Sequence, residues 1–291
     1  MNHELREKIK RLRERLSSCD ICPRECGADR LGGQTGQCGA GKEVAISGYG
    51  PHFGEERPLV GRGGSGTIFF AFCSLRCVFC QNFTTSRGRD AFEISTSQLA
   101  DIMLRLQNRG CININLVSPT HYTPQILEAL SEARARGLRL PLVYNCSGYE
   151  KLDVLAELDG VVDIYMPDIK YADAEIARKY SGIENYPEVA RAALKEMYRQ
   201  VGDLQLNEKG EAVRGLLIRH LVMPGGLAGT AELMEFIARE VSPTSWINVM
   251  DQYHPAYLAH RYPEIARTIT RQEFEEALKA TRRASVGFHL L

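Results

Sequence analysis

The chain has 291 residues, of which 36 are basic and 36 acidic, so its formal net charge is zero. This balance gives no reason to expect a nucleic acid, a membrane surface or a polyanionic substrate as a partner. The charged N-terminus does not predict a signal peptide, and no stretch approaches the length of a membrane span. We therefore expect a cytoplasmic protein made of one large α/β domain or two smaller ones.

Nine cysteines, seven of them in two close groups, are the most informative feature of the composition. In a reducing compartment such groups indicate metal ligands rather than disulfides. Cys111 and Cys146 stand apart from both groups, and we expect them to be small buried apolar residues.

The chain begins with a predicted amphipathic helix at residues 3–17, because Leu5, Ile9, Leu12 and Leu16 recur at helical spacing among charged residues. We expect its basic face to be solvated.

The first cysteine group follows this helix and contains four thiols within twenty residues, separated by glycines that allow tight turns around a metal. Its members are Cys19, Cys22, Cys26 and Cys38. Four thiolates complete either a zinc tetrahedron or a closed iron–sulfur cluster, and the spacing is not that of a common zinc finger. An iron–sulfur cluster, zinc and no metal all stay open. We expect residues 1–50 to form a metal-binding segment, and residues 51–291 to form the main domain.

A predicted strand at residues 43–49 leads into a loop in which Glu55 and Glu56 follow His52. The two acids are candidates for the substrate side of a site. The glycine-rich stretch at residues 61–66 matches no phosphate-binding pattern, so a turn that feeds the next strand is the better interpretation.

The second cysteine group comes directly after an apolar run at residues 67–72, which predicts a buried strand. Cys73, Cys77 and Cys80 are spaced to direct three thiolates toward one point, whereas an iron–sulfur cube normally takes four. One iron would keep an open position where a substrate can bind, as in catalytic zinc sites. The alternatives are a three-thiolate zinc site completed by a residue elsewhere, and a chance grouping.

This Cys-x3-Cys-x2-Cys motif, with Phe79 before the last cysteine and Gln81-Asn82 after it, resembles the radical S-adenosylmethionine (SAM) superfamily. The branch it most resembles is that of the pyruvate formate-lyase activating enzymes and their homologues. The resemblance implies that Cys73, Cys77 and Cys80 hold a [4Fe-4S] cluster and that Phe79 lies beside the adenine of SAM. It also implies reductive cleavage of SAM to a 5′-deoxyadenosyl radical that abstracts hydrogen. A flavodoxin- or ferredoxin-like electron donor and a protein substrate are the expected partners. Homologues of this branch carry a similar N-terminal cysteine segment.

From residue 67 onward, apolar runs alternate with helical patterns, which indicates a parallel sheet with helical crossovers. The other predicted strands lie at residues 112–118, 140–145, 161–169, 213–223 and 245–250. The predicted helices lie at residues 96–109, 123–136, 149–158, 173–202 and 229–241, with a last one at 271–284. Six such strands fit an incomplete (β/α)6 TIM-like barrel, with the Cys-rich N-terminus as a small extension. The resemblance implies the same fold, although periodicity alone also allows a doubly wound sheet.

Ligands of parallel α/β folds bind at the carboxyl ends of the strands, so polar residues there are candidates for SAM binding. After the second barrel strand, most activating enzymes have Gly-Gly-Glu, and this chain has Ser118, Thr120 and His121. These three residues are the candidates for the SAM amino group. His121 also fits a turn position satisfied by the local backbone.

The next three strand ends carry further candidates. Asn145 matches the family position near the SAM ribose, or alternatively caps a helix. Asp168 and Lys170 are two residues apart on one face of an extended strand, and the family has Asp-x-Lys there. Only one of Arg219 and His220 can face the barrel interior, and the family motif favours Arg219, whose fork suits the SAM carboxylate.

The last strand end supplies substrate-side candidates, or alternatively a satisfied polar network. They are Asp251, Gln252, Tyr253 and His254. The sequence thus predicts a radical SAM oxidoreductase that activates a glycyl-radical enzyme, or else modifies a small molecule or another peptide. A non-catalytic electron-transfer protein fits less well, because a carrier needs a closed cluster and no ligand chamber.

Overall fold

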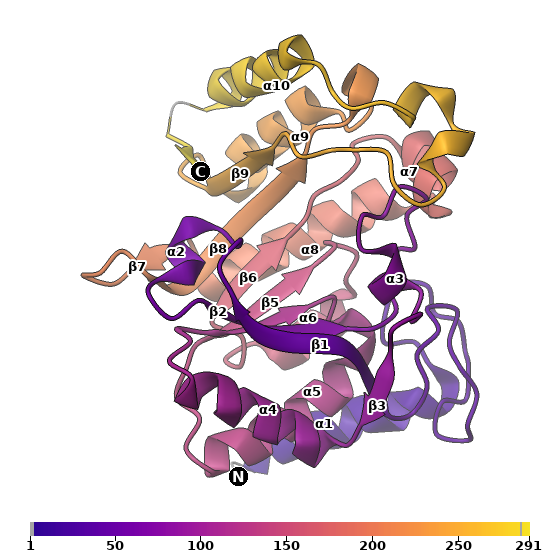
Figure 1. The fold of residues 1–291 in the computed structure, drawn as a ribbon, viewed down its shortest axis with the longest axis vertical. Coiled ribbons are helices and arrows are strands. Elements are labelled where there is room, and N and C mark those ends of the chain that lie inside the picture. Colours follow the sequence, from indigo (N-terminus) through magenta and orange to yellow (C-terminus); the bar gives the residue numbers. More distant parts are fainter. Residues whose placement is uncertain (1–2, 286) are drawn as a thin grey trace.

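The structure is a computed structural model that describes residues 3–285 and 287–291. Its central feature is a run of neighbouring parallel strands, which confirms the predicted α/β architecture (Figure 1). These strands are β2 (Ser65–Phe70), β4 (Ile114–Val117), β5 (Leu142–Cys146), β6 (Ile164–Pro167), β8 (Ala212–Leu221) and β9 (Trp246–Met250). The described sheet ends at two different edge strands without returning on itself, so the barrel is open, as predicted.

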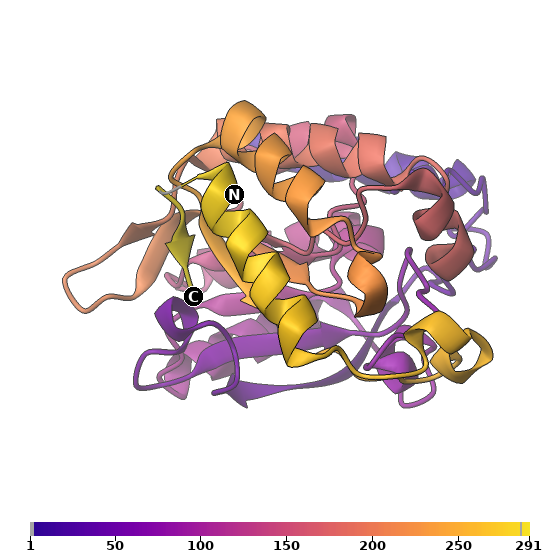
Figure 2. The same ribbon diagram turned by 90° about the horizontal axis from the view of Figure 1, so that it is seen from above.

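Shorter strands extend this sheet at both edges. β1 (Val44–His52) pairs antiparallel with β2, and β3 (Phe92–Ile94) pairs antiparallel with β1. At the other edge β10 (His289–Leu290) runs parallel to β9. β7 (Gln205–Leu206) forms a hairpin with β8 that projects from the body in both views (Figures 1 and 2). The sequence pattern missed β3, β7 and β10, because two or three residues are too few to show a period.

The longer helices lie close to their predicted positions. They are α1 (His3–Glu14), α4 (Thr96–Asn108), α5 (Thr123–Ala135), α6 (Leu152–Leu158), α7 (Ala174–Ser181), α8 (Tyr186–Val201), α9 (Thr230–Phe236) and α10 (Arg271–Ala284). Two four-residue helices, α2 (Arg57–Val60) and α3 (Phe83–Ser86), lie in loops. Figure 1 shows α1, α4 and α5 together at one end of the molecule and α9 and α10 at the other.

One helical prediction needs correction, because the pattern at residues 173–202 divides into α7 and α8. Gly182 ends α7 in the left-handed conformation, with φ of 65°. Pro187 then lies in the first turn of α8, where its missing N–H costs no hydrogen bond. The amphipathic period continues across the break, so it could not reveal the division.

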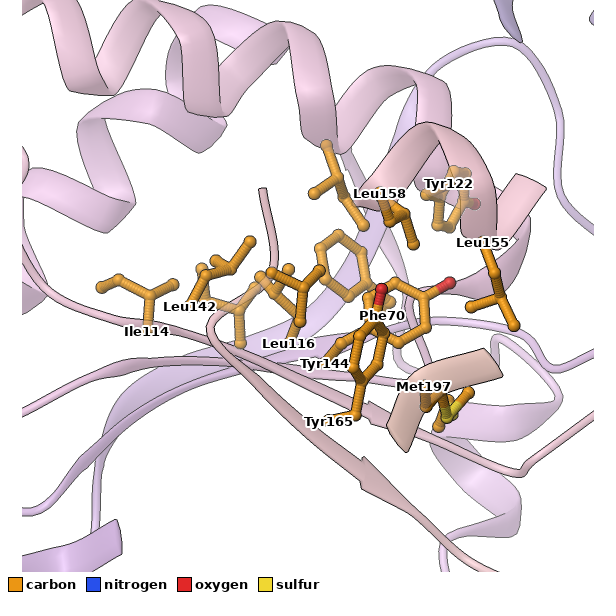
Figure 3. Close-up of a cluster of buried hydrophobic side chains, with 14 of the residues drawn as sticks. Phe70, Ile114, Leu116, Tyr122, Leu142, Tyr144, Leu155, Leu158, Tyr165 and Met197 are labelled. Carbon is orange, nitrogen blue, oxygen red and sulfur yellow. The ribbon is translucent and has the colours of Figure 1, made fainter. Parts of the chain in front are cut away.

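The hydrophobic core lies between the sheet and its helices (Figure 3). Phe70, Leu116 and Tyr144 come from neighbouring strands and are almost fully buried. Because strand side chains alternate between faces, Asn115 and Asn145 project to the opposite side, into the barrel interior. Packing of the apolar face therefore fixes which polar residues meet inside the barrel.

The N-terminal segment joins the same core through Leu12, Leu16 and Ile21. The division near residue 50 stays a prediction, and β1 spans that position. Among residues 3–285 and 287–291, no helix combines the length and apolar character needed to cross a bilayer.

Candidate functional site

A cavity of about 250 Å³ opens at the carboxyl ends of the parallel strands. Cys73, Cys77 and Cys80 form part of its wall, and polar residues from the ends of β5, β6 and β8 form another part. The structure thus brings the second cysteine group and several predicted strand-end residues together around one space. A single cavity of this kind at strand ends is the usual position of a ligand site.

Hydrogen bonds hold the thiols of this cysteine loop. The Leu75 amide donates to Cys73 Sγ at 3.4 Å, and the Ser181 hydroxyl donates to Cys77 Sγ at 3.1 Å. Burial raises the pKa of Cys77 to about 11, and it also raises the pKa of Cys80. These buried thiols keep their protons at neutral pH unless a metal replaces them.

The backbone around the cavity is strained. Of five described non-glycine residues with positive φ, three line the cavity: Phe72 at 71°, Arg76 at 58° and Ser118 at 58°. Side chains with a Cβ rarely adopt this region, and such residues cluster at binding and catalytic sites. The strain supports a functional role for the cavity.

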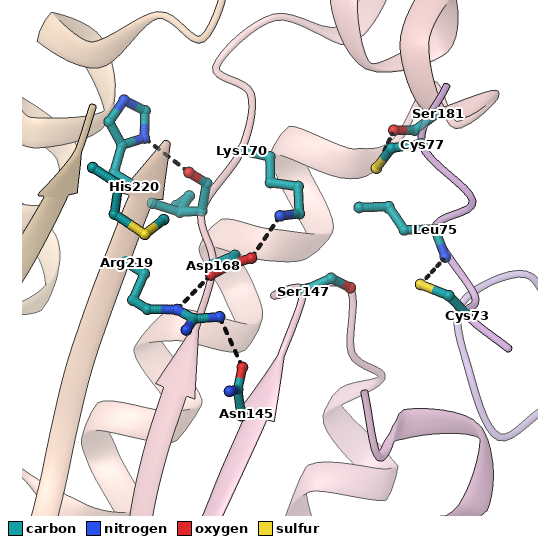
Figure 4. Close-up of polar contacts among 12 residues, drawn as sticks. Cys73, Leu75, Cys77, Asn145, Ser147, Asp168, Lys170, Ser181, Arg219 and His220 are labelled. Atoms are coloured by element: carbon teal, nitrogen blue, oxygen red, sulfur yellow. Dashed lines mark hydrogen bonds and ion pairs between the residues drawn. The ribbon is translucent and has the colours of Figure 1, made fainter. Parts of the chain in front are cut away.

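A network of charges links the strand ends opposite the cysteine loop (Figure 4). Lys170 Nζ lies 2.6 Å from Asp168 Oδ2, and Arg219 Nε donates to Asp168 Oδ1 at 2.7 Å. Arg219 Nη2 also donates to Asn145 Oδ1 at 2.9 Å. Burial alone would raise the pKa of Asp168, but Arg219 and Lys170 lower it to about 2. All four residues line the cavity.

The two acids of the loop before α2 approach Arg219 from the barrel interior. Arg219 Nη1 donates to Glu55 Oε1 at 3.2 Å, and Asn115 Nδ2 donates to Glu55 Oε2 at 2.6 Å. Glu56 accepts a hydrogen bond of 2.9 Å from Asn248 of β9. Burial, opposed by Arg219 and reinforced by Glu56, raises the pKa of Glu55 to about 7. Both acids lie beside the cavity residue Arg219 but outside the lining of the cavity.

The candidates after β4 divide between the cavity and the core. Ser118 lines the cavity, whereas Thr120 donates to Glu150 at 2.6 Å inside the protein. His121 is buried with Nε2 2.8 Å from the Ala71 carbonyl, and burial lowers its pKa to about 3. The structure therefore places only Ser118 of these three against the cavity, and His121 in the position of a turn histidine with a backbone partner.

The last strand end is also divided. Gln252 lines the cavity and Tyr253 is buried, with its ring 5.8 Å from that of Phe79. His254 lies 3.2 Å from Gln81, whose amide also donates to the Gln252 carbonyl. Asp251 is exposed and does not line the cavity.

The positions of His220 and Asn145 bear on two alternatives at the strand ends. His220 is buried on the face opposite Arg219, where its ring nitrogens lie 2.8 Å from the Ile169 carbonyl and 2.8 Å from Thr230. Lys151, not Asn145, occupies the cap position of α6.

Two residues beside the cavity were not predicted from the sequence. Ser181, at the end of α7, reaches Cys77 from 104 positions away. Tyr186 accepts from the Lys170 amide at 2.9 Å and lies within hydrogen-bond distance of the Ser147 and Asp168 carbonyls. Both act across long sequence separations, and no local pattern could have identified them.

The N-terminal thiols, which form the first cysteine group, lie in loops between α1 and β1. Burial raises the pKa of Cys22 to about 12, and the neighbouring thiols Cys38 and Cys19 act in the same direction. Cys26 Sγ lies within 3.8 Å of the Cys19 carbonyl. In the part of the chain that the structure describes, neither thiol group draws three ligands onto one point that a single metal ion could occupy.

The residues around the cavity fit a [4Fe-4S] cluster with SAM. Three thiols form part of one wall of the cavity, and Lys170, Asp168 and Asn145 supply donors and an acceptor for an amino acid. Such a set matches the charges of the SAM methionine group.

Comparison with known proteins identifies the family of this chain. Residues 67–203 match the radical SAM superfamily. The chain is 30% identical over 280 residues to the uncharacterized protein MJ0674 of Methanocaldococcus jannaschii, covering 94% of this chain and 76% of that protein. It is also similar to structures of Streptococcus suis SuiB, one of them bound to the precursor peptide SuiA, at 13% identity and TM-scores of 0.49 and 0.48. It covers 47% and 46% of those chains, with 76% and 75% of its own length. Its cysteine loop lies within the matched segment, and this chain belongs to the radical SAM superfamily.

Proposed function

We propose that this protein cleaves SAM reductively and uses the resulting radical to abstract a hydrogen atom from a substrate. The observation that carries this proposal is the shared cavity, whose wall combines three thiols with the charged ends of β6 and β8. When bound, the cluster supplies one electron, obtained from a flavodoxin- or ferredoxin-like donor, that splits SAM into methionine and a 5′-deoxyadenosyl radical.

The side chains around the cavity have separate tasks in this proposal. Cys73, Cys77 and Cys80 hold the cluster. Lys170 contacts one carboxylate oxygen of Asp168 and has further N–H donors for the SAM carboxylate. Arg219 already uses Nε, Nη1 and Nη2 on protein acceptors, so we assign it to positioning Asp168 and Asn145.

The remaining contacts concern the rest of SAM. The Asn145 amide nitrogen is available for a ribose hydroxyl, because its oxygen accepts from Arg219. Phe79 lies within the cysteine loop, lines the cavity and belongs to an aromatic cluster with Tyr171 and Tyr253, which supports a place beside the adenine. Ser118, in its strained turn, is the proposed contact of the amino group.

The substrate class that we propose is a glycyl Cα of a partner protein, supported by the resemblance of the cysteine loop and of Asp168-x-Lys170 to activating enzymes. A small molecule or another peptide is the alternative. Candidates labelled with deuterium can be compared, since only the true substrate transfers deuterium into 5′-deoxyadenosine.

The test of SAM cleavage is Cys77→Ala in anaerobically reconstituted protein, with dithionite as the reductant. We expect the variant to release no 5′-deoxyadenosine, because the cluster loses a ligand. Cys111→Ala is the matched control, since Cys111 is a buried cysteine outside the cavity lining, and it should retain turnover. Clusters without any SAM cleavage in the wild type would instead indicate an electron-transfer protein, and turnover in Cys77→Ala would contradict the proposed site.

A further inference from the structure

The four N-terminal thiols lie along a loop segment that contains two tight turns, and Cys26 lies against the second turn. The Glu25 amide donates to the Cys22 carbonyl at 3.0 Å and closes the first turn. The second turn contains Gly36, and a Cβ built there would lie 3.4 Å from both Cys26 Sγ and Cys38 Sγ. Glycine therefore leaves room for both sulfurs beside the same backbone position.

A buried cation lies against this group. Arg30 is fully buried, and its Nη1 lies 3.7 Å from Cys19 Sγ and 2.7 Å from the His121 carbonyl. Its Nε donates to the Gly41 carbonyl, and its Nη2 is buried without a hydrogen-bond partner. Within residues 3–285 and 287–291, no ion pair joins Arg30 to a carboxylate. A buried guanidinium without a counter-charge is strongly unfavourable, so this position calls for an anion.

We propose that Cys19, Cys22, Cys26 and Cys38 bind a second metal centre as thiolates, and that Arg30 is its buried counter-charge. Four thiolates around Zn²⁺ leave an excess of negative charge, and an iron–sulfur cluster with four thiolate ligands is the other source of the same anionic group. Because no three thiols converge on one point, loading has to draw the sulfurs together around one ion or bridge them with several metal atoms.

The N-terminal thiol group is attached directly to the cysteine loop of the cavity, which carries Cys73, Cys77 and Cys80. Arg24, between Cys22 and Cys26, donates to the Ser74 carbonyl, and at 3.2 Å to the Leu75 carbonyl. In the opposite direction Arg76 donates to the Gln37 carbonyl at 2.7 Å. The metal would therefore also fix the segment against which the cysteine loop of the cavity packs.

The Phe72 ring adds an apolar contact between the same two segments. A Cβ at Gly39 would lie 2.5 Å from this ring, and a Cβ at Gly88 would also overlap it. The ring fits only because both neighbours are glycines. The second metal centre goes beyond SAM cleavage, and its metal content can be measured whether or not SAM is cleaved.

The first experiment uses Cys73→Ala/Cys77→Ala/Cys80→Ala as the background, so that retained metal belongs to the N-terminal group. One sample is reconstituted anaerobically with ferrous iron and sulfide, and another with zinc, before gel filtration. We expect about four irons with sulfide, or about one zinc, per chain. Adding Cys22→Ala/Cys38→Ala should lower the retained metal at least tenfold. Either metal supports the proposal and identifies the centre, whereas no metal in protein with wild-type circular dichroism overturns it.

The second experiment tests Arg30 through Arg30→Met and Arg30→Lys in the same background. Arg15→Met is the matched control, because Arg15 lies in the same segment but is paired with Asp20 at 2.7 Å. We expect Arg30→Met to lose metal to a chelator at least tenfold faster than the other two variants.

A melting comparison separates this role from simple packing. Arg30→Met should lower the melting temperature more in metal-loaded than in metal-free protein, because only the loaded site carries the opposing charge. Equal losses in both states, or equal metal retention in Arg30→Met and Arg30→Lys, would show that Arg30 is not the counter-charge. If Arg30→Met is too unstable to bind metal, its melting temperature in metal-free protein will already be much lower than that of the parent, and this result would also show that Arg30 is not the counter-charge.

Discussion

Asp168 and Glu55 contact the same guanidinium, that of Arg219, yet their pKa values move in opposite directions. Asp168 faces the cavity between two cations, and its pKa falls to about 2. Glu55 is buried beside a second acid, and its pKa rises to about 7. Proximity to a cation therefore does not decide the charge of a buried carboxyl group. The balance of burial and all neighbouring charges decides it.

This difference divides the network into two parts with different tasks. Around neutral pH the cavity side holds a permanent carboxylate, which fixes Lys170 and Arg219 in place. The interior side can hold a proton on Glu55, so its charge changes near neutral pH. In the function proposed above, the first part binds SAM and the second part contributes to the charge balance around Arg219.

The largest effect should come from Asp168→Asn, which leaves two largely buried cations without their shared acceptor. Breaking a buried ion pair in this way costs about 3–5 kcal/mol, measured as the free energy of unfolding in denaturant. Asp173→Asn is the control, because Asp173 caps α7 at the surface and asparagine caps equally well. A loss below 1 kcal/mol would mean that the cavity side of the network contributes little.

Lys170→Met should have the next effect, and mainly on ligand binding. Asp168 keeps Arg219 as a partner, whereas the SAM carboxylate loses a charge-assisted hydrogen bond of about 1.5–3 kcal/mol. Affinity for SAM, measured by titration calorimetry of reconstituted protein, should fall roughly 10- to 150-fold. Unchanged affinity would show that Lys170 does not bind the SAM carboxylate.

Glu55→Gln should give the smallest effect, visible as a change in pH dependence. Glu55 has a raised pKa in the folded protein, about 7 against 4.5, so its stabilising contribution is complete below pH 4.5. This contribution is lost as pH rises toward 7, at up to about 1.4 kcal/mol per pH unit. The free energy of unfolding of the variant should lack this slope.

Asp168 cannot produce the same slope, since its contribution is lost only as pH falls from 3.8 toward 2. The exposed Glu275→Gln is the control and should keep the wild-type slope. Parallel curves for wild type and Glu55→Gln between pH 4.5 and 7 would show that Glu55 is ionised throughout.

Much of this architecture could be predicted from the sequence, because the parallel strands are apolar runs and the two thiol groups have recognisable spacing. The shared facing of Asp168 and Lys170 followed from the two-residue period of a strand, whereas the choice of Arg219 over His220 followed from the family motif. The positions of the residues after β4 were harder to predict, because the positive φ of Ser118 turns the chain and directs Thr120 into the core.

Other parts of the site depend on contacts between distant segments. Glu55 acquires its environment from β4 and β8, and Cys77 acquires a hydrogen-bond donor from the end of α7. A period or a motif describes one segment at a time, so it contains no information about such pairs. The metal of the N-terminal group stays a prediction for a different reason: the spacing of its thiols fits both iron–sulfur clusters and zinc.

The Phe72 ring, held between Gly39 and Gly88, joins three stretches of chain whose sizes must match. A larger residue at either glycine position can be accommodated only if position 72 becomes smaller. Among related chains, we therefore expect these three positions to covary in volume. The N-terminal segment and the cysteine loop would then evolve as a single unit, even where the residues between them diverge.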